Sequence, residues 1–386
     1  MDFSSFNAVS RVVHGWGSIQ ALPEEFKRLG LDRSKVLIVS DAGIASTGIL
    51  DRTASILSAA GFETEKFTEI SNDPPISDAE ASVEFAKRYK PGAVLGIGGG
   101  SSLDIAKLAA LMPTNSGTLE SYLGMDLVEN PGIPLILMPT AAGTGSEVTN
   151  ISVLSDPANN IKKAVVSRHS YARAVLLDPE LSVGLPPKIT AMTGMDALVH
   201  ATESFVGKRA TLFTDALNIE AIRVIGANLR QAYSNGQDQE ARTNMMYASC
   251  MAGMAFSNTQ NGLDHALALA IGGRYHLPHG LLTAFICPWV MEFNMVAAPE
   301  KFARIALALG VKPDGKSTAE LAEASVDCVR SLLSDLNIST RLGTYDVPPD
   351  AFADIARGTV GAARLISNNP RDVTEKDVVA LLEANY

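Results

Sequence analysis

The stretch that decides the fold class of the N-terminal half is Ala93-Val94-Leu95-Gly96-Ile97-Gly98-Gly99-Gly100-Ser101-Ser102. It starts as a buried-strand pattern, glycines close the strand, and a helical pattern opens near Leu103. Glycines let the backbone approach a ligand, and free N–H groups at a helix start favour a phosphate. The stretch therefore predicts an anion-binding turn between a strand and a helix. A turn without a ligand is the alternative, and the loop matches neither G-x-G-x-x-G nor the P-loop pattern.

The residues around this stretch repeat the alternation of strand and helix up to about residue 180. Apolar runs predict three more strands, at 36–40, 134–139 and 174–177, and an amphipathic pattern at 79–89 predicts a helix. Strands that alternate with helices favour a parallel sheet with helices on its faces. Ligands of such sheets bind beyond the carboxyl ends of the strands.

After Leu185-Pro186-Pro187 the pattern changes to helices, and Thr190 is a candidate N-cap of the first one. The predicted helices are 188–205, 211–233, 239–256 and 263–271. No convincing strand pattern follows. We therefore expect an α/β domain over residues 1–185 and an all-α domain over residues 186–386.

Composition narrows the classes of function. The 386 residues carry a formal net charge of −10, which disfavours nucleic acid as a partner because phosphate contacts need clustered Lys and Arg. The three cysteines lack metal or redox spacing, which is typical of buried free thiols in a reducing compartment. The N-terminal residues 1–17 lack the apolar core of a signal peptide, and no apolar run approaches ~18 residues. We expect a cytoplasmic protein with no membrane partner.

A second loop, Pro139-Thr140-Ala141-Ala142-Gly143-Thr144-Gly145-Ser146-Glu147, also follows a predicted strand. Its hydroxyl groups and backbone N–H groups can donate to a phosphate or ribose, although a capping turn explains the pattern as well. Asp41 ends the first clear strand, where a carboxylate accepts from a ribose diol and repels a 2′-phosphate; Asp is also common at such turns. Together these features favour one shared nucleotide site.

Asp and His residues of the C-terminal half have the spacing of metal ligands. Asp196 and His200 are four residues apart on a predicted helix, so both project from one face. His265 lies on a later helix, and His279 follows Pro278. Any one of these histidines alone is more often an ordinary buried or surface residue. The set as a whole suits Fe²⁺, Zn²⁺ or a similar ion, which with an open position polarises an alcohol or carbonyl oxygen.

Several segments carry a resemblance to a known family: Gly98–Ser101, Pro139–Thr149, Asp178–Leu181, Gly194–Glu203 and His265–Gly280. On these segments the chain resembles the iron-containing (group III) alcohol dehydrogenases over nearly its whole length. The resemblance implies a Rossmann-like, nucleotide-binding α/β domain with a parallel sheet, followed by an all-α helical domain, in a dehydroquinate synthase-like architecture. It implies hydride transfer between NAD and a small alcohol or aldehyde held on one divalent metal, Fe²⁺ or Zn²⁺. NADP is less expected, because Asp41 stands where an acidic residue accompanies a preference for NAD.

The resemblance also implies roles for individual residues. The implied metal ligands are Asp196, His200, His265 and His279. The implied cofactor-binding residues are Asp41, Gly98, Gly99, Gly100, Ser101, Asp104, Thr140, Thr144, Ser146, Thr149, Lys162 and Leu181. Phe256 stands where the family has an aromatic side chain that faces the substrate.

Two positions depart from the family pattern. Leu269 stands where the family has a further histidine that relays the alcohol proton. His276, water or the cofactor ribose would then take over the relay, and a structural loop histidine is the alternative for His276. Asp73 replaces an asparagine that often lies near the adenine.

Other functions stay open beside this one. A maleylacetate reductase-like or dehydroquinate synthase-like enzyme shares the architecture, and the missing relay histidine leaves a non-catalytic nucleotide- or metal-binding protein as an alternative. The expected partner is a small alcohol or aldehyde. The resemblance also implies a homodimer or higher homo-oligomer, with residues 6–13 as a candidate interface strand.

Overall fold

The computed structural model describes residues 5–158 and 161–386, which divide into two compact units. The N-terminal unit comprises Asn7–Ala141 and Gly145–Gly184. The helical unit comprises Ala142–Thr144 and Leu185–Tyr386, together with residues 5 and 6. The short segment Ala142–Thr144 therefore leaves the N-terminal unit and packs with the helices, a detail that the strand-and-helix pattern does not reveal.

The N-terminal unit is built on a six-stranded, wholly parallel sheet in the order β1-β9-β6-β4-β2-β3. Its strands are β1 (Val12–His14), β2 (Lys35–Val39), β3 (Glu63–Phe67), β4 (Ala93–Gly98), β6 (Leu135–Pro139) and β9 (Ala174–Leu177). The central strands are continuous apolar runs, as expected where both faces of a sheet are buried. The predicted parallel sheet is confirmed. The edge strand β3 escaped prediction because it is largely polar, and β1 overlaps only the last two residues of the candidate interface strand at residues 6–13.

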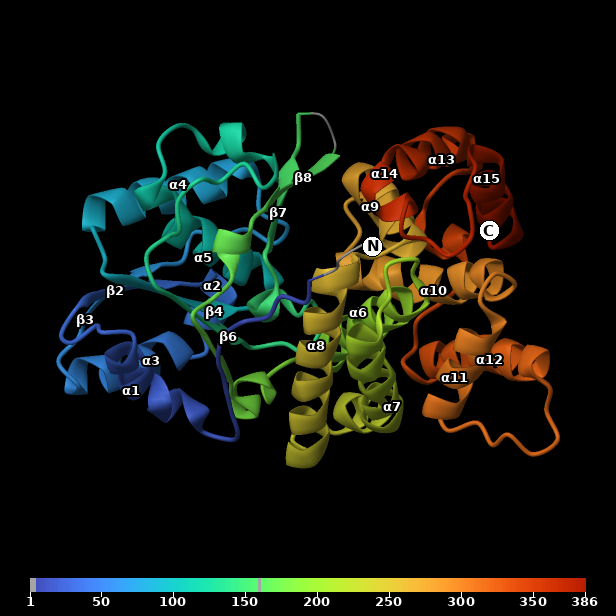
Figure 1. Cartoon of the computed structure of the whole chain (residues 1–386), viewed down its shortest axis with the longest axis horizontal. Helices are drawn as coiled ribbons and strands as arrows, with labels where there is room; N and C mark the ends of the chain where they lie inside the picture. The colour runs from blue at the N-terminus through green and yellow to red at the C-terminus, as the bar shows by residue number, and fades with distance from the viewer. Residues whose placement is uncertain (1–4, 159–160) are drawn as a thin grey trace. The chain divides into compact units, whose positions relative to one another are not determined.

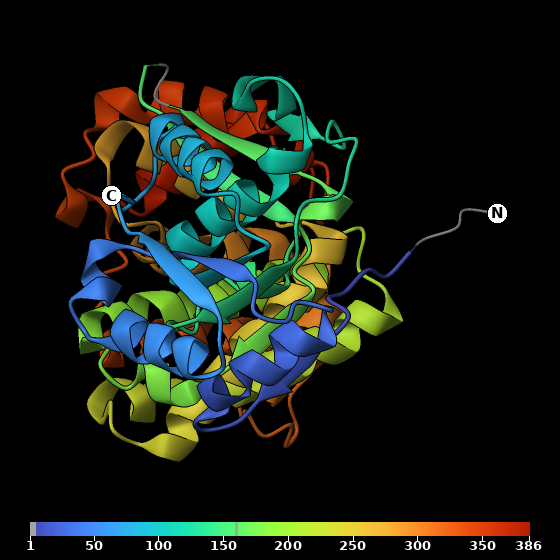
Figure 2. The same cartoon turned by 90° about the vertical axis from the view of Figure 1, so that its left-hand side faces the viewer.

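Helices cover both faces of this sheet (Figures 1 and 2). The helices of the unit are α1 (Leu22–Arg28), α2 (Ala42–Ala45), α3 (Ile49–Ala59), α4 (Ile76–Tyr89) and α5 (Gly100–Leu111). α1 and α3 pack with alternate residues of the central strands in one core cluster, whereas α4 and α5 contact each other on the opposite face. α5 begins at Gly100, three residues before the predicted start, so the last glycine of the loop is already helical.

A second, three-stranded sheet and several short 3-10 turns complete the N-terminal unit. The small sheet has the order β5-β8-β7, with β5 (Gly124–Met125), β7 (Ile151–Asp156) and β8 (Ile161–Val166). The 3-10 turns are η1 (Ser18–Ala21), η2 (Met112–Thr114), η3 (Leu119–Tyr122), η4 (Ser146–Val148), η5 (Arg168–Ser170) and η6 (Pro179–Ser182). The antiparallel pairing of β7 with β8 was not predicted.

The helical unit contains the remaining elements. They are α6 (Pro187–Val206), α7 (Leu212–Ser234), α8 (Gln239–Thr259), α9 (Leu263–Tyr275), α10 (His279–Met295), α11 (Pro299–Ala308), α12 (Thr318–Asp335), η7 (Leu342–Tyr345), η8 (Pro349–Ala351), α13 (Phe352–Gly361), α14 (Ala363–Ile366) and α15 (Glu375–Ala384). The predicted all-α character of this half is confirmed.

Local chemistry sets the helix ends in this unit. Thr211 forms a capping box with Thr214 at the start of α7, and Asp238 accepts from a backbone N–H at the start of α8. The prediction that Thr190 caps α6 is wrong. α6 already begins at Pro187, because proline suits the first turn of a helix, and Thr190 lies buried inside it as an acceptor for Arg242.

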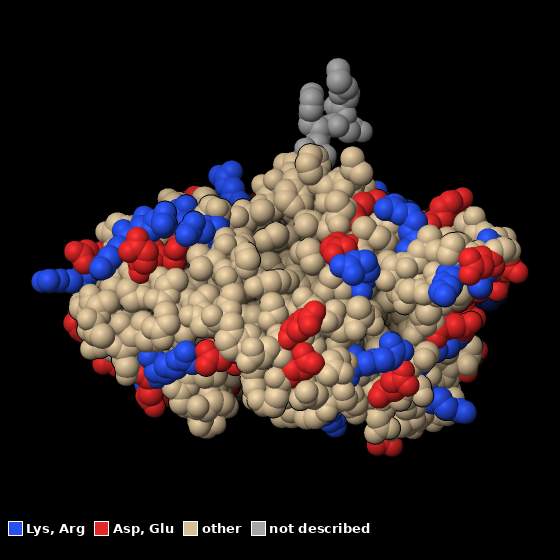
Figure 3. Space-filling model, turned by 90° about the horizontal axis from the view of Figure 1, so that it is seen from below, with Lys and Arg blue, Asp and Glu red and all other residues tan. Residues whose placement is uncertain are grey.

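Among the described residues, every helix is too short or too polar to cross a membrane. On the face shown in Figure 3, acidic and basic side chains are interspersed around a broad uncharged area.

Candidate functional site

Four helical-unit side chains from three helices gather at one place, where Asp196, His200 and His265 are buried and His279 is exposed. Asp196 and His200 lie four residues apart on α6, His265 lies in the first turn of α9, and His279 is the first residue of α10. One carboxylate oxygen of Asp196 and one ring nitrogen each of His265 and His279 lie within 4.8 Å of one another. His200 lies outside this mutual set, but its Nδ1 is 3.9 Å from the other oxygen of Asp196. The structure thus brings all four predicted ligands together around Asp196.

The separations between these atoms suit a shared cation better than hydrogen bonds. Nε2 of His265 and Nε2 of His279 lie 3.9 and 3.7 Å from Oδ1 of Asp196, beyond hydrogen-bonding distance. Ligand atoms that share one ion at about 2.0–2.2 Å lie roughly 3–4 Å apart. Nε2 of His265 and Nδ1 of His200 are also buried and have no hydrogen-bond partner among the described residues. Buried nitrogens without partners are rare, so the donor set fits a divalent metal.

The charge states of the cluster also suit a cation. Burial alone would raise the pKa of Asp196, but the three histidines and a hydrogen bond from Thr283 outweigh it, and the net pKa is lowered. Burial lowers the pKa of His200 to about 3, against the opposing effect of Asp196. His200 is therefore neutral at pH 7 and keeps a nitrogen lone pair, while Asp196 is a carboxylate. Neutral imidazoles and a carboxylate are the forms that bind metal.

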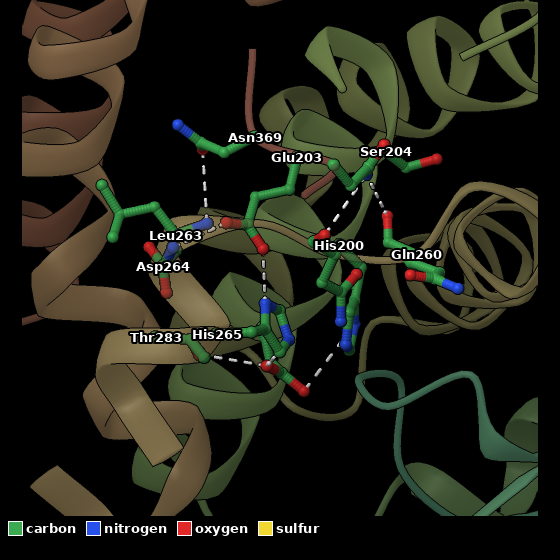
Figure 4. A network of polar contacts seen from close by, with 12 residues as sticks. His200, Glu203, Ser204, Gln260, Leu263, Asp264, His265, Thr283 and Asn369 are labelled. Atoms are coloured by element: carbon green, nitrogen blue, oxygen red, sulfur yellow. Dashed lines mark hydrogen bonds and ion pairs between the residues drawn. The ribbon is translucent and has the colours of Figure 1, made fainter. Parts of the chain in front are cut away.

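Residues outside the predicted set hold these side chains in place (Figure 4). Glu203, one turn beyond His200 on α6, binds Nδ1 of His265 at 2.7 Å and the backbone N–H of Asp264 at 2.7 Å. Thr283 of α10 donates to Asp196 Oδ1 at 3.0 Å. Glu203 ends one of the segments that carry the family resemblance, so its position, one turn from a predicted ligand, was the available signal. Nothing in the local sequence singled out Thr283.

Asp264 is a second buried carboxyl beside this network. It is 1% exposed, and neither of its side-chain oxygens has a hydrogen-bond partner among the described residues. Burial, Glu203 and Asp196 raise the pKa of Asp264 well above its usual range. Burial and the two neighbouring carboxylates therefore disfavour the charged form of Asp264.

The predicted substrate-side residues occupy different surroundings. The ring of Phe256 stacks on His200, with centroids 4.3 Å apart and an interplanar angle of 15°. Leu269 is half-buried and lies one turn after His265 on α9. His276 ends α9 in a left-handed conformation with φ 53° and is exposed. Among the described residues, His276 is not part of the group that could hold a metal ion. Its relay role stays a prediction.

The first turn of α10 is fixed against α6 by a close backbone approach. A Cβ on Gly280 would lie 2.7 Å from the carbonyl oxygen of Met192 and 3.0 Å from its carbonyl carbon. Both atoms belong to a helix backbone, which cannot move cheaply. Glycine at this position therefore lets His279, the preceding residue, lie beside α6.

The glycine loop of the N-terminal unit joins the carboxyl end of β4 to α5. Gly98 has φ +147°, and a Cβ there would lie 2.6 Å from Ser102 and 3.3 Å from Asp41. Asp41 itself caps α2 by accepting from Ile44 N–H and accepts the Ser102 hydroxyl at 2.7 Å. Among the described residues, no side chain caps the start of α5. The structure thus places Asp41 beside the glycine loop and leaves the N–H groups of a twelve-residue helix start to bind an anion.

Ser146 of the second loop and Thr149, two residues after that loop, contact a buried lysine. Nζ of Lys107 on α5 donates to Asp104, Ser146 and Thr149 at 3.1, 2.7 and 3.0 Å, and to the carbonyl of Ile151 at 2.6 Å. Sequence reasoning missed Lys107, because a lysine in a helix is ordinarily solvated. The three predicted cofactor residues in this network hold the loop against α5 with their side chains.

The remaining predicted cofactor residues are distributed over both units. Lys162 on β8 pairs with Asp73 and donates to Ser155 at 2.7 Å, and burial lowers the pKa of Lys162 to about 8. Leu181 on η6 is part of the hydrophobic core under the sheet. Thr140 is buried at the end of β6, where its N–H donates to the carbonyl of Gly98, whereas Thr144 packs with the helical unit.

Comparisons with known proteins show the family of the chain. Residues 9–179 match the family described as iron-containing alcohol dehydrogenase, and residues 190–386 match the C-terminal part of the same family. A sulfoacetaldehyde reductase from Bilophila wadsworthia is 45% identical over 98% of both chains. A 1,3-propanediol dehydrogenase from Citrobacter freundii is 37% identical over 96% of both chains. A solved 1,3-propanediol oxidoreductase structure superposes with a TM-score of 0.96 at 34% identity, covering 100% of both chains.

The parallel α/β unit, the helical unit and the buried Asp–His cluster define an oxidoreductase that acts on CH–OH groups. More particularly, the chain belongs to the iron-containing alcohol dehydrogenase family. The resemblance and the enzyme class expected from the sequence are confirmed.

Proposed function

We propose that the enzyme interconverts a small aldehyde and its alcohol with NAD(H), and that Asp196, His200, His265 and His279 hold one divalent metal, Fe²⁺ or Zn²⁺. The observation that carries this proposal is the cluster around Asp196, in which two buried ring nitrogens lack partners. Leaving such groups unsatisfied costs free energy that a bound cation would recover. A cytoplasmic location and a homodimer or larger homo-oligomer stay predictions from the sequence.

The side chains of the cluster each have a definable part in this reaction. A divalent metal, when bound, supplies Lewis-acid polarisation of the substrate oxygen, and NAD(H) supplies or accepts the hydride. Asp196 contributes a negative charge that offsets the cation, and His200 contributes a lone pair because its pKa is lowered. Phe256 lies flat on His200 and, with Leu269, gives the site an apolar wall that excludes water.

His276 is the proposed proton relay, because Leu269 stands where the family has the relay histidine. Its position at the exposed end of α9, three residues before His279, leaves it in contact with solvent. Relay through His276 predicts that His276→Ala changes the pH dependence of kcat. An unchanged pH–rate profile would remove His276 from the relay and leave water or the cofactor ribose.

The glycine loop supports NAD as the cofactor. Its uncapped helix start can hold the pyrophosphate, and the nearby Asp41 carboxylate would repel a 2′-phosphate. Asp41→Asn keeps the side-chain acceptor for Ile44 N–H and removes the charge, so it should raise kcat/KM with NADP relative to NAD. Asp41→Gly removes both charge and cap and serves as the comparison variant. An unaltered cofactor ratio in both variants would contradict this part of the proposal.

Sulfoacetaldehyde is the aldehyde proposed first as substrate, because the Bilophila wadsworthia relative is named for its reduction. A sulfoacetaldehyde reductase structure from Bifidobacterium kashiwanohense in complex with NAD⁺ also superposes, with a TM-score of 0.89 at 25% identity over 100% of this chain and 99% of that one. A sulfonate is an anion, so its binding site needs a cationic side chain. Arg209 and Arg364 are considered for this part because, among the described residues, no carboxylate lies within 4 Å of either guanidinium.

Arg364 is the proposed partner of the sulfonate. It lies on α14, which packs against α9, the helix that carries His265. Burial and then Arg209 lower the pKa of Arg364, so its charge is poorly compensated within the chain. Arg364→Ala should raise KM for sulfoacetaldehyde and leave KM for propanal unchanged. Arg357→Ala, which removes an exposed arginine paired with Asp354, is the control. Equal effects on both aldehydes would exclude Arg364 as the sulfonate partner.

Metal analysis combined with a substrate panel tests the proposal as a whole. The purified protein is assayed for bound metal and for NADH absorbance at 340 nm with neutral and sulfonated aldehydes and alcohols. His265→Ala should lose metal and turnover together, whereas His169→Ala, outside the cluster, should keep both. Full turnover after chelation of the wild type would refute the metal assignment.

A further inference from the structure

Glu203 uses its two carboxylate oxygens on two different partners. Oε1 accepts the backbone N–H of Asp264, and Oε2 is 2.7 Å from Nδ1 of His265 (Figure 4). Glu203 and His265 are each 5% exposed, so water does not compete for this contact. The first oxygen replaces a missing helix cap, because Gly262 precedes α9 and offers no side chain. The second oxygen contacts His265 and does not accept from the start of α9 among the described residues.

The contact with Glu203 decides which nitrogen of His265 carries the proton. A carboxylate only accepts hydrogen bonds, so Nδ1 must carry the hydrogen, and Nε2 must carry the lone pair. Nε2 is buried without a hydrogen-bond partner among the described residues and lies 3.9 Å from Asp196 Oδ1. The ring is therefore held in the one tautomer and orientation that can donate a lone pair into the cluster.

We infer that Glu203 is a positioning residue that fixes the tautomer and orientation of His265 and thereby raises the affinity of the cluster for a divalent cation. This inference rests on the proposed metal site and adds a residue outside the ligand set. A carboxylate behind a metal-binding imidazole orients the ring and raises its basicity, and its loss typically weakens metal affinity 10–100-fold. Glu203 acts through His265 and is not itself a ligand.

Glu203→Gln separates this role from simple packing, because glutamine has the same shape but only one acceptor oxygen. If that oxygen stays with Asp264 N–H, the amide NH₂ faces Nδ1 of His265 and favours the wrong tautomer. If the amide flips, the start of α9 loses its acceptor. Because Glu203 accepts from the N–H of Asp264 at 2.7 Å, whereas Asn369 accepts only from the N–H of Leu263, we expect the first arrangement.

The experiment measures metal affinity without turnover. Apo wild type, Glu203→Gln and Glu203→Ala are titrated with Co²⁺, followed by visible absorption, and with Zn²⁺ in competition with a chelating dye. Glu25→Gln is the matched control, because Glu25 is also a buried carboxylate, paired with Arg11 in the N-terminal unit. Histidine ¹⁵N NMR of the apo proteins reports the tautomer of His265, and circular dichroism verifies folding.

We expect 10–100-fold weaker binding of both ions by the two Glu203 variants, wild-type affinity in Glu25→Gln, and a shift of His265 toward the Nε2–H tautomer in Glu203→Gln. If Glu203→Ala fails to fold, Glu203→Gln decides the question alone. Affinity within twofold of wild type, with an unchanged tautomer, would overturn the inference and leave the metal site intact. Failure of the wild type to bind either ion would instead refute the proposed metal site.

Discussion

Glu147 offers the sharpest test of how the buried loop contributes to stability. It lies in η4, is 2% exposed, and has no cation within 4 Å of its carboxylate among the described residues. Burial raises the pKa of Glu147 from 4.5 to about 7, although its own backbone N–H and Lys107 act in the opposite direction. The folded chain therefore holds a proton that the unfolded chain has released between about pH 4.5 and pH 7.

The magnitude follows from the two pKa values. Below about pH 4.5 the carboxyl is neutral in both states and contributes nothing, and above about pH 7 the folded state carries the full cost of a buried charge. At about 1.4 kcal/mol per pH unit, the change from 4.5 to about 7 corresponds to a loss of about 3 kcal/mol in the free energy of unfolding. Stability attributable to Glu147 therefore falls as pH rises through this window.

Glu147→Gln removes the charge at nearly constant shape. Urea unfolding of wild type and variant at pH 5, 6, 7 and 8 should give similar free energies at pH 5 and a variant more stable by up to about 3 kcal/mol at pH 8. Glu84→Gln, on the exposed side of α4, is the control and should show one constant difference at every pH. Parallel curves for Glu147→Gln, or a variant that is less stable at pH 8, would refute the reasoning.

Three further substitutions probe the site and its supports. Lys107→Met should lower the free energy of unfolding in urea by about 3–5 kcal/mol, because it leaves Asp104 buried without its cation. A decrease below about 1 kcal/mol would contradict a stabilising role of this network. Gly280→Ala should weaken Zn²⁺ binding in a dye competition, since its Cβ would push α10 away from the Met192 carbonyl; unchanged affinity would show that α6 yields there. Asp264→Asn should keep metal affinity within about threefold, because burial and the neighbouring carboxylates already disfavour the charged form of Asp264; a tenfold loss would contradict this reasoning.

Much of the fold was accessible from local pattern because its central elements are long and strongly periodic. The four apolar strands and the first four helices after residue 185 were predicted within a few residues, whereas α10 to α15 were not predicted individually. The edge strand β3 and the β7–β8 pair were missed, because half-exposed strands carry mixed residues whose pairing depends on distant neighbours, and β1 was expected only as part of a candidate interface strand at residues 6–13. Thr190 was misplaced because proline at Pro187 starts the helix one turn earlier.

The residues of the candidate site also fall into those that the sequence predicted and those that it did not. Asp196, His200, His265 and His279 were recognisable because metal ligands have restricted chemistry and spacing. Glu203, Thr283 and Asp264 were not singled out, because a side chain that supports a ligand has no motif of its own and is recognised only by what it touches.

The sequence by itself determined the parallel α/β half, the helical half, the glycine loop and the residue types of the proposed metal site, because each depends on short-range periodicity or on chemistry intrinsic to a side chain. Only the tertiary structure decided which oxygen of Glu203 meets His265, that Lys107 is buried among Asp104, Ser146 and Thr149, and that Asp41 lies against Ser102. These contacts join residues up to 62 positions apart, and their protonation and geometry arise from burial, which no local pattern encodes.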